Sequence, residues 1–377
     1  MSRYSFQHSI KSRAGTNDDL LIQVLDGLLS RYLDRVPDAS RIVAIVQARG
    51  DRIINDHIAF RSIHIESILT IFLHLGYEVR FDHSTGQPFN FEQKKLTAVW
   101  LKHPNKNVPR IFVSQFRFTE GSEQLQKIIG KYLKDWKDPI NDLDLNDAQA
   151  INEYLHTAQW PTPTYSDYLE IQKESEYVAW VLFNKYYLNH FTLSIHELSS
   201  FEFESDLVEV INNYQKSYHK TKSLDVIVDA QNMLFRKYRK HFKAFNDFLF
   251  DHKFHMNSVG DGVMNISPDH CLLQSSTKAN EIMASFPDGN YSVPGSYVEF
   301  AYRGFSKDTI TKLVRANVPI IDLSIENRRD GFETQNADRI FESTYLGKET
   351  IINNSQSAYV DSCKKIINFL NHFNEYN

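Results

Sequence analysis

Cysteine is scarce in this sequence, and a concentrated basic region and a long apolar run are both missing. Cys271 and Cys363 are the two cysteines among 377 residues, which excludes a disulfide framework or a cysteine-rich zinc module and fits a reducing compartment. No segment approaches the roughly 20 uninterrupted apolar residues of a membrane span. Lysine and arginine total 42 against 47 aspartates and glutamates. A partner bound through its phosphates, such as a nucleic acid, is therefore not expected.

Several sequence signatures of catalysis are also missing. The chain has no glycine-rich phosphate loop of the Walker type, no Gly-x-Ser-x-Gly elbow and no His-Glu-x-x-His motif. The run Gly260-Asp261-Gly262 predicts a hairpin turn instead. Near the N-terminus, Arg3, Lys11 and Arg13 resemble a transit peptide only faintly, and we expect a cytoplasmic protein.

The hydrophobic share of 42% is ordinary for a globular protein and excludes disorder as the main state. An N-terminal helical segment, residues 1–50, is expected to hold a helix over 18–36 that ends at Pro37. Residues 51–134 then read as strand, helix, strand, strand, strand and a following helix. These elements are expected at residues 53–63, 66–75 with Gly76 as helix cap, 77–82, 96–103, 110–116 and 122–134.

A similar order recurs after a linker and helix, residues 135–187, with the helix at 168–187. The second unit, residues 188–305, is expected to hold strands at 188–195, 254–257, 262–267, 271–276 and 296–303, with a helical insertion at 201–236 and a helix at 241–250. No function is predicted for the inserted residues 196–240. The C-terminal segment, 306–377, is expected to pack on the core and to close with a helix at 357–373. The fold class predicted is therefore α+β, with two divergent βαβββ units forming one curved sheet around a central cavity.

Two histidines and one glutamate occupy positions inside the predicted buried strands. His57 and His190 lie at equivalent places in the two units, and Glu299 lies between apolar neighbours. A buried imidazole or carboxylate needs a partner. Each histidine could simply be a satisfied core residue, and Glu299 could form a salt bridge with Arg303, four residues further on.

Together, however, these three residues match the two-histidine, one-carboxylate triad of non-haem Fe(II) oxygenases. In that triad the three ligands occupy one face of an octahedron and leave positions open for substrate and dioxygen. Zn(II) or Mn(II) could also bind the same three residues, so the ligand types alone leave the metal open.

Other polar residues are candidates for binding a substrate. Arg61 follows His57 by four residues, so it faces the same side of its strand and could bind a carboxylate by a bidentate fork. It could equally pair with Asp56, Glu78 or Asp82. Gln274 and Ser276 could orient a ligand or cap a following helix, and Ser343 is a weaker candidate of the same kind.

Four segments of the sequence resemble the signature blocks of one known family, the 2-oxoadipate dioxygenase/decarboxylase or hydroxyglutarate synthase family, once described as DUF1338. The blocks are Asn55-Asp56-His57-Ile58-Ala59-Phe60-Arg61, Asn189-His190-Phe191-Thr192, Leu272-Leu273-Gln274-Ser275-Ser276-Thr277 and Tyr297-Val298-Glu299-Phe300-Ala301-Tyr302-Arg303. The resemblance implies a fold related to the vicinal-oxygen-chelate superfamily. It also implies that His57, His190 and Glu299 match the family's iron ligands and that Arg61 matches its substrate-carboxylate arginine.

The activity implied by the resemblance is the conversion of 2-oxoadipate and dioxygen to 2-hydroxyglutarate and carbon dioxide, in lysine catabolism. The expected cofactor is Fe(II), and the expected partners are a small 2-oxo diacid and O₂, with no nucleic acid and no membrane. Two other functions stay open at this point. One is a different metalloenzyme on the same scaffold, such as a ring-cleaving dioxygenase or an isomerase, and the other is a non-catalytic ligand-binding module. The sequence predicts no oligomeric state.

Overall fold

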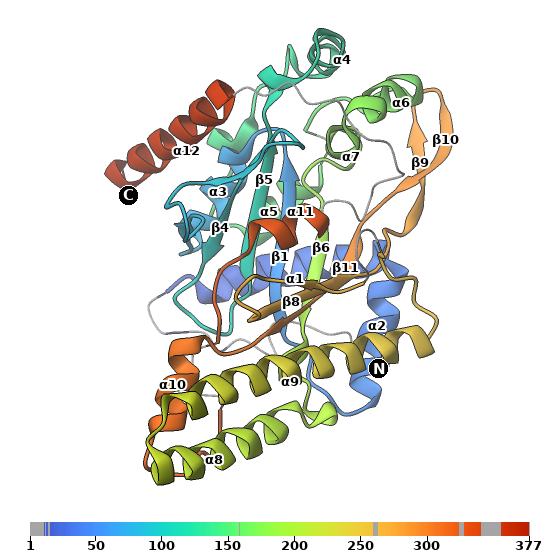
Figure 1. Ribbon diagram of the computed structural model, residues 1–377. Helices are drawn as coiled ribbons and strands as arrows, with labels where there is room; N and C mark the ends of the chain where they lie inside the picture. Colours follow the sequence, from blue (N-terminus) through green and yellow to red (C-terminus); the bar gives the residue numbers. More distant parts are fainter. Residues whose placement is uncertain are drawn as a thin grey trace.

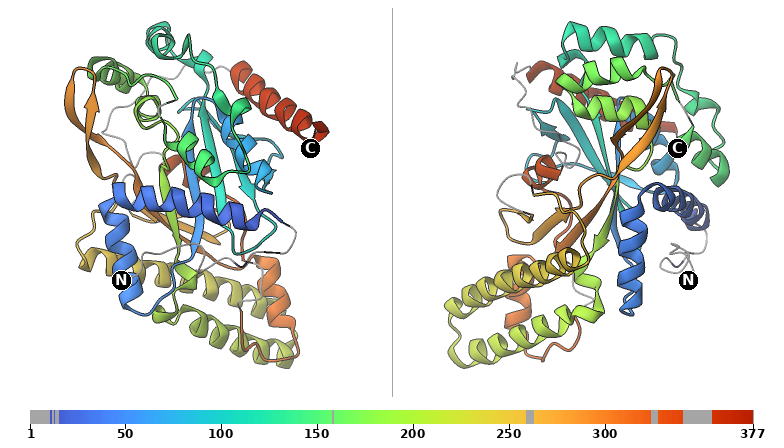
Figure 2. Two further views of the ribbon diagram at one scale, coloured as in Figure 1. Left: turned by 180° about the vertical axis from the view of Figure 1, so that it is seen from behind. Right: turned by 90° about the vertical axis from the view of Figure 1, so that its right-hand side faces the viewer.

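A computed structural model describes residues 11, 13, 16–157, 159–258, 263–323, 328–340 and 356–376. In this part of the chain, nine strands form one mixed, curved sheet in the order β2-β4-β5-β1-β6-β11-β8-β7, with β3 paired to β4 (Figure 1). Helices lie around the sheet, as the views in Figure 2 show. No helix in the described ranges is both long and apolar enough to cross a membrane.

The first half of the sheet follows the predicted order of strand, helix and three strands. Its elements are β1 (Asn55–Ser62), α3 (Ile65–His74), β2 (Glu78–Arg80), β3 (Phe89–Phe91), β4 (Leu96–Lys102) and β5 (Arg110–Phe116). The first strand, β1, pairs in parallel with the last, β5, and the remaining pairs are antiparallel. The short strand β3 was not predicted. Gly76 has a φ of 88° after α3, as expected of a helix-ending glycine.

The second half of the sheet repeats this pairing. Its strands are β6 (His190–Ser194), β7 (Asn265–Ile266), β8 (Leu272–Ser276) and β11 (Tyr297–Arg303). Again the first strand, β6, is parallel to the last, β11, and β11 is antiparallel to β8. An antiparallel contact between β1 and β6 joins the two halves into one sheet. This arrangement confirms the predicted fold class of two βαβββ units.

Two details of the second half differ from the sequence-based expectation. An unpredicted hairpin, β9 (Glu281–Phe286) and β10 (Gly289–Pro294), forms a separate two-stranded sheet. Residues 254–257 form no strand, and Met256 makes a single bridge to Thr277. The predicted turn at 260–262 lies outside the described residues.

Before the second half of the sheet, the structure has more helices than the sequence pattern predicts. α1 (Asp18–Arg35) ends where predicted, but Pro37 begins a second helix, α2 (Pro37–Ala48), because proline suits the first helical turn. The single helix expected at 168–187 is two, α6 (Tyr165–Glu174) and α7 (Glu176–Asn184), since Ser175 is extended and caps α7. The other helices here are α4 (Glu123–Leu133) and α5 (Ala148–His156), and the short 3₁₀ helices are Phe118–Glu120, Pro139–Asp142, Ile195–Glu197 and Ser199–Phe201.

The helical insertion is a long antiparallel hairpin at one end of the sheet (Figure 1). It consists of α8 (Phe203–Thr221) and α9 (Leu224–Asp251), and the helix predicted separately at 241–250 is the second half of α9. One buried stripe runs along the whole of α9, from Ile227 to Leu249, so tertiary packing keeps it continuous. α10 (Lys307–Arg315) packs on both helices, and α11 (Thr334–Ile340) and α12 (Gln356–Tyr376) complete the described chain. The closing helix predicted at 357–373 corresponds to α12.

Candidate metal centre

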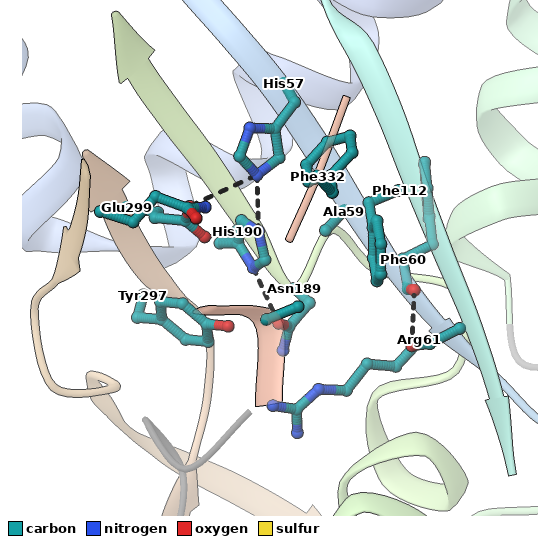
Figure 3. Close-up of a pocket in the computed structure, with 13 residues that line it drawn as sticks. His57, Ala59, Phe60, Arg61, Phe112, Asn189, His190, Tyr297, Glu299 and Phe332 are labelled. Carbon is teal, nitrogen blue, oxygen red and sulfur yellow. Dashed lines mark hydrogen bonds and ion pairs between the residues drawn. The ribbon is translucent and has the colours of Figure 1, made fainter. Parts of the chain in front are cut away.

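Three adjacent strands, β1, β6 and β11, bring His57, His190 and Glu299 together on one face of the sheet. Thr192 of β6 stands opposite both His57 and Glu299, and His190 lies two residues before it on the same face. The Nε2 atom of His190 lies 3.1 Å from Glu299 Oε2, and the Nε2 atom of His57 lies 3.5 Å from Glu299 Oε1. The two Nε2 atoms are 3.4 Å apart. Figure 3 shows the three side chains converging.

The residue before each histidine holds the far side of its ring. His57 Nδ1 lies 2.8 Å from the carboxylate of Asp56, and His190 Nδ1 lies 3.0 Å from Oδ1 of Asn189. Both partners accept a hydrogen bond, so each Nδ1 is the donor, and each Nε2 faces Glu299, where it can bind a metal ion once it has lost its proton. This is the arrangement that orients histidine ligands in metal sites. It is built in the same way in both halves of the fold.

Glu299 is also held by a relay of amides. Gln274 Nε2 donates to Glu299 Oε1 at 2.6 Å, and Asn336 Nδ2 donates to Gln274 Oε1 at 3.0 Å. The donated bond from Asn336 fixes which end of the Gln274 amide faces the carboxylate. The salt bridge considered between Glu299 and Arg303 does not form, because the Arg303 guanidinium instead binds both oxygens of Asp56, at 2.6 and 2.9 Å.

The electrostatics of the cluster favour a bound cation. Burial by itself would raise the pKa of Glu299, but the positive charge of the two histidines outweighs it and lowers the pKa to about 2. Burial also lowers the pKa of His190, whereas at His57 the charges of Glu299 and Asp56 outweigh burial and raise the pKa. The site therefore holds a carboxylate that stays ionised, with two imidazoles beside it.

The donor set fits a divalent transition metal ion. The ligand atoms of His57, His190 and Glu299 all lie within 4.8 Å of one another, and all three residues are buried. Two imidazole nitrogens and one carboxylate oxygen are the ligands of the two-histidine, one-carboxylate triad. An ion among them would replace the protons that the histidines otherwise share with Glu299.

A cavity adjoins the cluster, with about 360 Å³ of empty space that is partly open to solvent. Six apolar or aromatic side chains and seven polar or charged side chains form its wall. The lining residues are His57, Ala59, Phe60, Arg61, Phe112, Ser114, Asn189, His190, Gln274, Tyr297, Glu299, Phe332 and Ala337.

Arg61 lies on β1 on the same side as His57, and its guanidinium is set apart from the cluster, beyond Asn189 (Figure 3). It is 1% exposed. The rings of Tyr177 and Trp180, both on α7, each lie 5.3 Å from its guanidinium carbon. A buried cation whose faces meet aromatic rings can still present its N–H edge to a carboxylate.

The acids considered as structural partners of Arg61 lie near other basic side chains. Asp56 pairs with Arg303, Glu78 with Arg80, and Asp82 lies 3.9 Å from a nitrogen of the neighbouring His83.

The remaining predicted site residues differ in where they lie. Gln274 lines the cavity and contacts Glu299 directly. Ser276 is buried and stands opposite Glu299 across the β8–β11 pair, but it is not among the described residues that line the cavity. Ser343 lies outside the described residues.

Several residues of the site were not singled out from the sequence. Asp56 and Asn189 carried a usable signal, since each directly precedes a candidate ligand histidine. The pairing register of the strand shifts between Asn55 and His57, next to Asp56. Phe332 and Asn336 follow the last strand of the sheet by about 30 residues, and no local pattern indicates that they return to the cavity.

Two βαβββ units that curl one sheet around a buried cluster of two histidines and a carboxylate form a fold of the vicinal-oxygen-chelate type. A solved structure of a putative glyoxalase superfamily protein from Ralstonia eutropha shares this fold. It is 18% identical with a TM-score of 0.54, over 78% of this chain and 87% of that one.

The particular family is identified by the sequence. The family model for 2-oxoadipate dioxygenase/decarboxylase matches residues 24–315, and the chain belongs to this family. A relative from Oryza sativa, named 2-oxoadipate dioxygenase/decarboxylase, chloroplastic/amyloplastic, is 32% identical over 344 residues, which is 87% of this chain and 79% of the relative. A relative from Arabidopsis thaliana, named 2-oxoadipate dioxygenase/decarboxylase, chloroplastic, is 32% identical over 340 residues, which is 85% of this chain and 76% of the relative.

A solved structure is also similar over nearly the whole chain. It is the crystal structure of the hydroxyglutarate synthase from Oryza sativa in complex with 2-oxoadipate. It is 30% identical to this chain with a TM-score of 0.68, and the match covers 92% of this chain and 97% of that one.

Proposed function

We propose that this protein is a non-haem Fe(II) dioxygenase/decarboxylase that converts 2-oxoadipate and O₂ to 2-hydroxyglutarate and CO₂. The observation that carries the proposal is a cavity with two chemically different ends. Two histidines and a carboxylate converge at one end, and a buried arginine, Arg61, stands apart from them. A 2-oxo diacid has the matching pair of groups, a 2-oxo acid and a distant carboxylate. The plant relatives carry the name of this activity, and the solved structure of the Oryza sativa hydroxyglutarate synthase is a complex with 2-oxoadipate.

His57, His190 and Glu299 would hold the iron. Bound there, Fe(II) would supply the open coordination positions at which a 2-oxo acid and dioxygen react. The protein's part is to keep these ligands in place. Asp56 and Asn189 hold the two imidazole rings with Nε2 directed inward.

Arg61 would bind the distal carboxylate of the substrate through a bidentate pair of N–H donors. Tyr177 and Trp180 hold the guanidinium from α7, so its position relative to the ligand cluster is set by the packing of α7 on β1. This fixes the register of a diacid in the cavity. A monoacid would lack the distal carboxylate that binds this buried cation, and losing that contact would cost about 2–5 kcal/mol.

The aromatic wall would keep water from the reacting end of the cavity. Phe332 lies edge-on to His57 with ring centroids 4.8 Å apart, and Phe112 packs on Phe332 at 4.9 Å. A dry wall strengthens each electrostatic contact inside it and limits side reactions with water.

We further propose that the protein works in the cytoplasm, in lysine catabolism. Both cysteines are buried and free, which suits a reducing compartment. The two plant relatives carry names that place them in plastids, so fractionation of the native cells is the direct test of the compartment.

Oxygen uptake by the protein, loaded with Fe(II) under anaerobic conditions, tests the proposed reaction. Adding 2-oxoadipate should start uptake with stoichiometric release of CO₂, and 2-oxoglutarate serves as the shorter control. Uptake should disappear in His57→Ala. Turnover without oxygen consumption would favour an isomerase on this scaffold, and binding of 2-oxoadipate without turnover would favour a ligand-binding module.

A further inference from the structure

A buried ion pair between Asp56 and Arg303 lies on the side of the His57 ring that faces away from Glu299. The Asp56 side chain is completely buried, and it binds His57 Nδ1 with one oxygen at 2.8 Å. Arg303 forms a bidentate pair with the same carboxylate: Nε donates to Oδ2 at 2.6 Å and Nη2 donates to Oδ1 at 2.9 Å. Such a fork fixes the orientation of both partners. Any shift of the carboxylate toward His57 is therefore transmitted to the guanidinium.

The remaining nitrogen of Arg303 binds a different part of the chain. Its Nη1 atom donates to the backbone carbonyl oxygens of Arg329, at 3.1 Å, and of Gly331, at 2.7 Å. These carbonyls belong to residues 328–332, which we call the wall segment. Phe332, its last residue, lines the cavity and contacts the ring of His57.

We propose that Arg303 is a positioning residue that couples occupancy of the metal centre to the placement of the wall segment. The proposal rests on the proposed function only in requiring a divalent cation at His57, His190 and Glu299. A cation on His57 Nε2 makes the Nδ1–H a stronger donor to Asp56. A stronger bond to His57 fixes the Asp56 carboxylate, and the carboxylate in turn fixes the Arg303 guanidinium. Because Arg303 Nη1 binds the carbonyl oxygens of Arg329 and Gly331, the wall segment is then held in place beside His57. Metal-loaded protein thereby acquires a better-ordered cavity than metal-free protein.

Backbone hydrogen exchange of the full-length protein, with and without Mn(II), measures this coupling without any turnover. Mn(II) binds the same ligand types and is stable in air. The Arg329 amide, which donates to the Gly304 carbonyl at 2.8 Å, reports on the wall segment. Saturating Mn(II) should slow exchange in peptides covering residues 328–332 by about fivefold or more, the lower end of typical coupling between two sites.

Three variants separate the route through Arg303 from simple ring packing. In Arg303→Lys the ammonium can still neutralise Asp56 but lacks the fork that also reaches two carbonyls. We expect Mn(II) affinity to stay within a few-fold of wild type and the protection of the wall segment to be lost. Asp56→Asn should weaken Mn(II) binding by about 10–100-fold. Phe332→Leu, the matched control, leaves the carbonyl bonds to Arg303 intact and should keep the Mn(II)-dependent protection.

The outcomes distinguish this inference from the proposed function. If wild-type protein binds Mn(II) with no change in exchange at residues 328–332, the coupling does not exist, whichever variants fold. Loss of protection in Phe332→Leu together with its retention in Arg303→Lys would assign the coupling to ring packing and overturn the role of Arg303. Failure of the wild type to bind Mn(II) would instead overturn the metal centre and the proposed function with it. Thermal melting of each variant identifies those that do not fold.

Discussion

Replacing Arg61 with methionine should remove the preference for diacids and leave the metal centre intact. Methionine is of similar length and apolar, so it can fill the space beside Tyr177 and Trp180 without opening a void. The distal carboxylate of 2-oxoadipate would then be buried beside the rings of Tyr177 and Trp180 without a cationic partner. Arg61 is 1% exposed, so solvent water does not reach this position to hydrogen-bond the carboxylate in place of the guanidinium.

The magnitude follows from the cost of an unpaired buried charge, about 2–5 kcal/mol when one partner of a buried pair is removed. At about 1.4 kcal/mol for each factor of ten, kcat/KM for 2-oxoadipate should fall by about 30-fold to a few thousand-fold. The six-carbon monoacid 2-oxohexanoate should lose nothing, because it has no distal carboxylate that could bind Arg61 in the wild type.

The assay is oxygen uptake with each acid by the Fe(II)-loaded variant, together with Mn(II) titration of the same preparation. Arg61→Lys is the matched control, since it keeps the charge and loses the fork, and its loss should be intermediate. A variant that bound Mn(II) poorly would refute the reasoning, because the arginine would then support the metal centre and not the substrate. An equal loss of activity toward diacid and monoacid would refute it as well.

Three further predictions concern the ligands, the packing and the pH dependence. His190→Ala should abolish stoichiometric Mn(II) binding measured by calorimetry, while Ser276→Ala should keep it; retention by His190→Ala would exclude this residue as a ligand. Gly304→Ala should destabilise the fold by about 1–3 kcal/mol in urea unfolding, because the added Cβ would lie 2.3 Å from a buried tyrosine ring of α9. The control Gly130→Ala has nothing within 4 Å and should stabilise α4 by up to about 1 kcal/mol; equal effects at both sites would contradict the packing argument. Burial lowers the pKa of Lys185 to about 7, against about 10.4 in an unfolded chain. The unfolded state therefore binds more protons between pH 7 and 10, and wild-type stability should rise with pH relative to Lys185→Met across that window, whereas a constant difference would contradict the shift.

Much of the fold could be predicted because local patterns carry it. Alternation of apolar and polar residues predicts the strand at 53–63, which contains β1. Turn residues, Pro294-Gly295 before it and Gly304 after it, mark the limits of the strand that forms β11. The repeated order of elements predicts that the two halves pair alike. Short elements without such a pattern were missed, among them β3 and the β9–β10 hairpin. The break at Ser175 was missed, although a polar run at residues 172–176 interrupts the apolar spacing there.

The candidate ligands could be predicted from polarity alone. His57, His190 and Glu299 interrupt strands that otherwise bury apolar side chains, and an unsatisfied polar group there would be costly. Equivalent positions in two similar units further suggested that the histidines meet. The resemblance to a family pointed to the same residues and to Arg61.

By itself, the amino-acid sequence determined the two βαβββ units, the three polar residues inside them and the side of β1 that Arg61 shares with His57, because these depend on periodicity along one strand. Only the tertiary structure decided which distant groups complete the site. Asp56 could have paired with Arg61, which is five residues away, but it is clasped by Arg303, 247 residues away. Phe332 and Asn336 return to the cavity from beyond the last strand. Such contacts depend on how separate elements pack, and the sequence spacing between them carries no periodic signal.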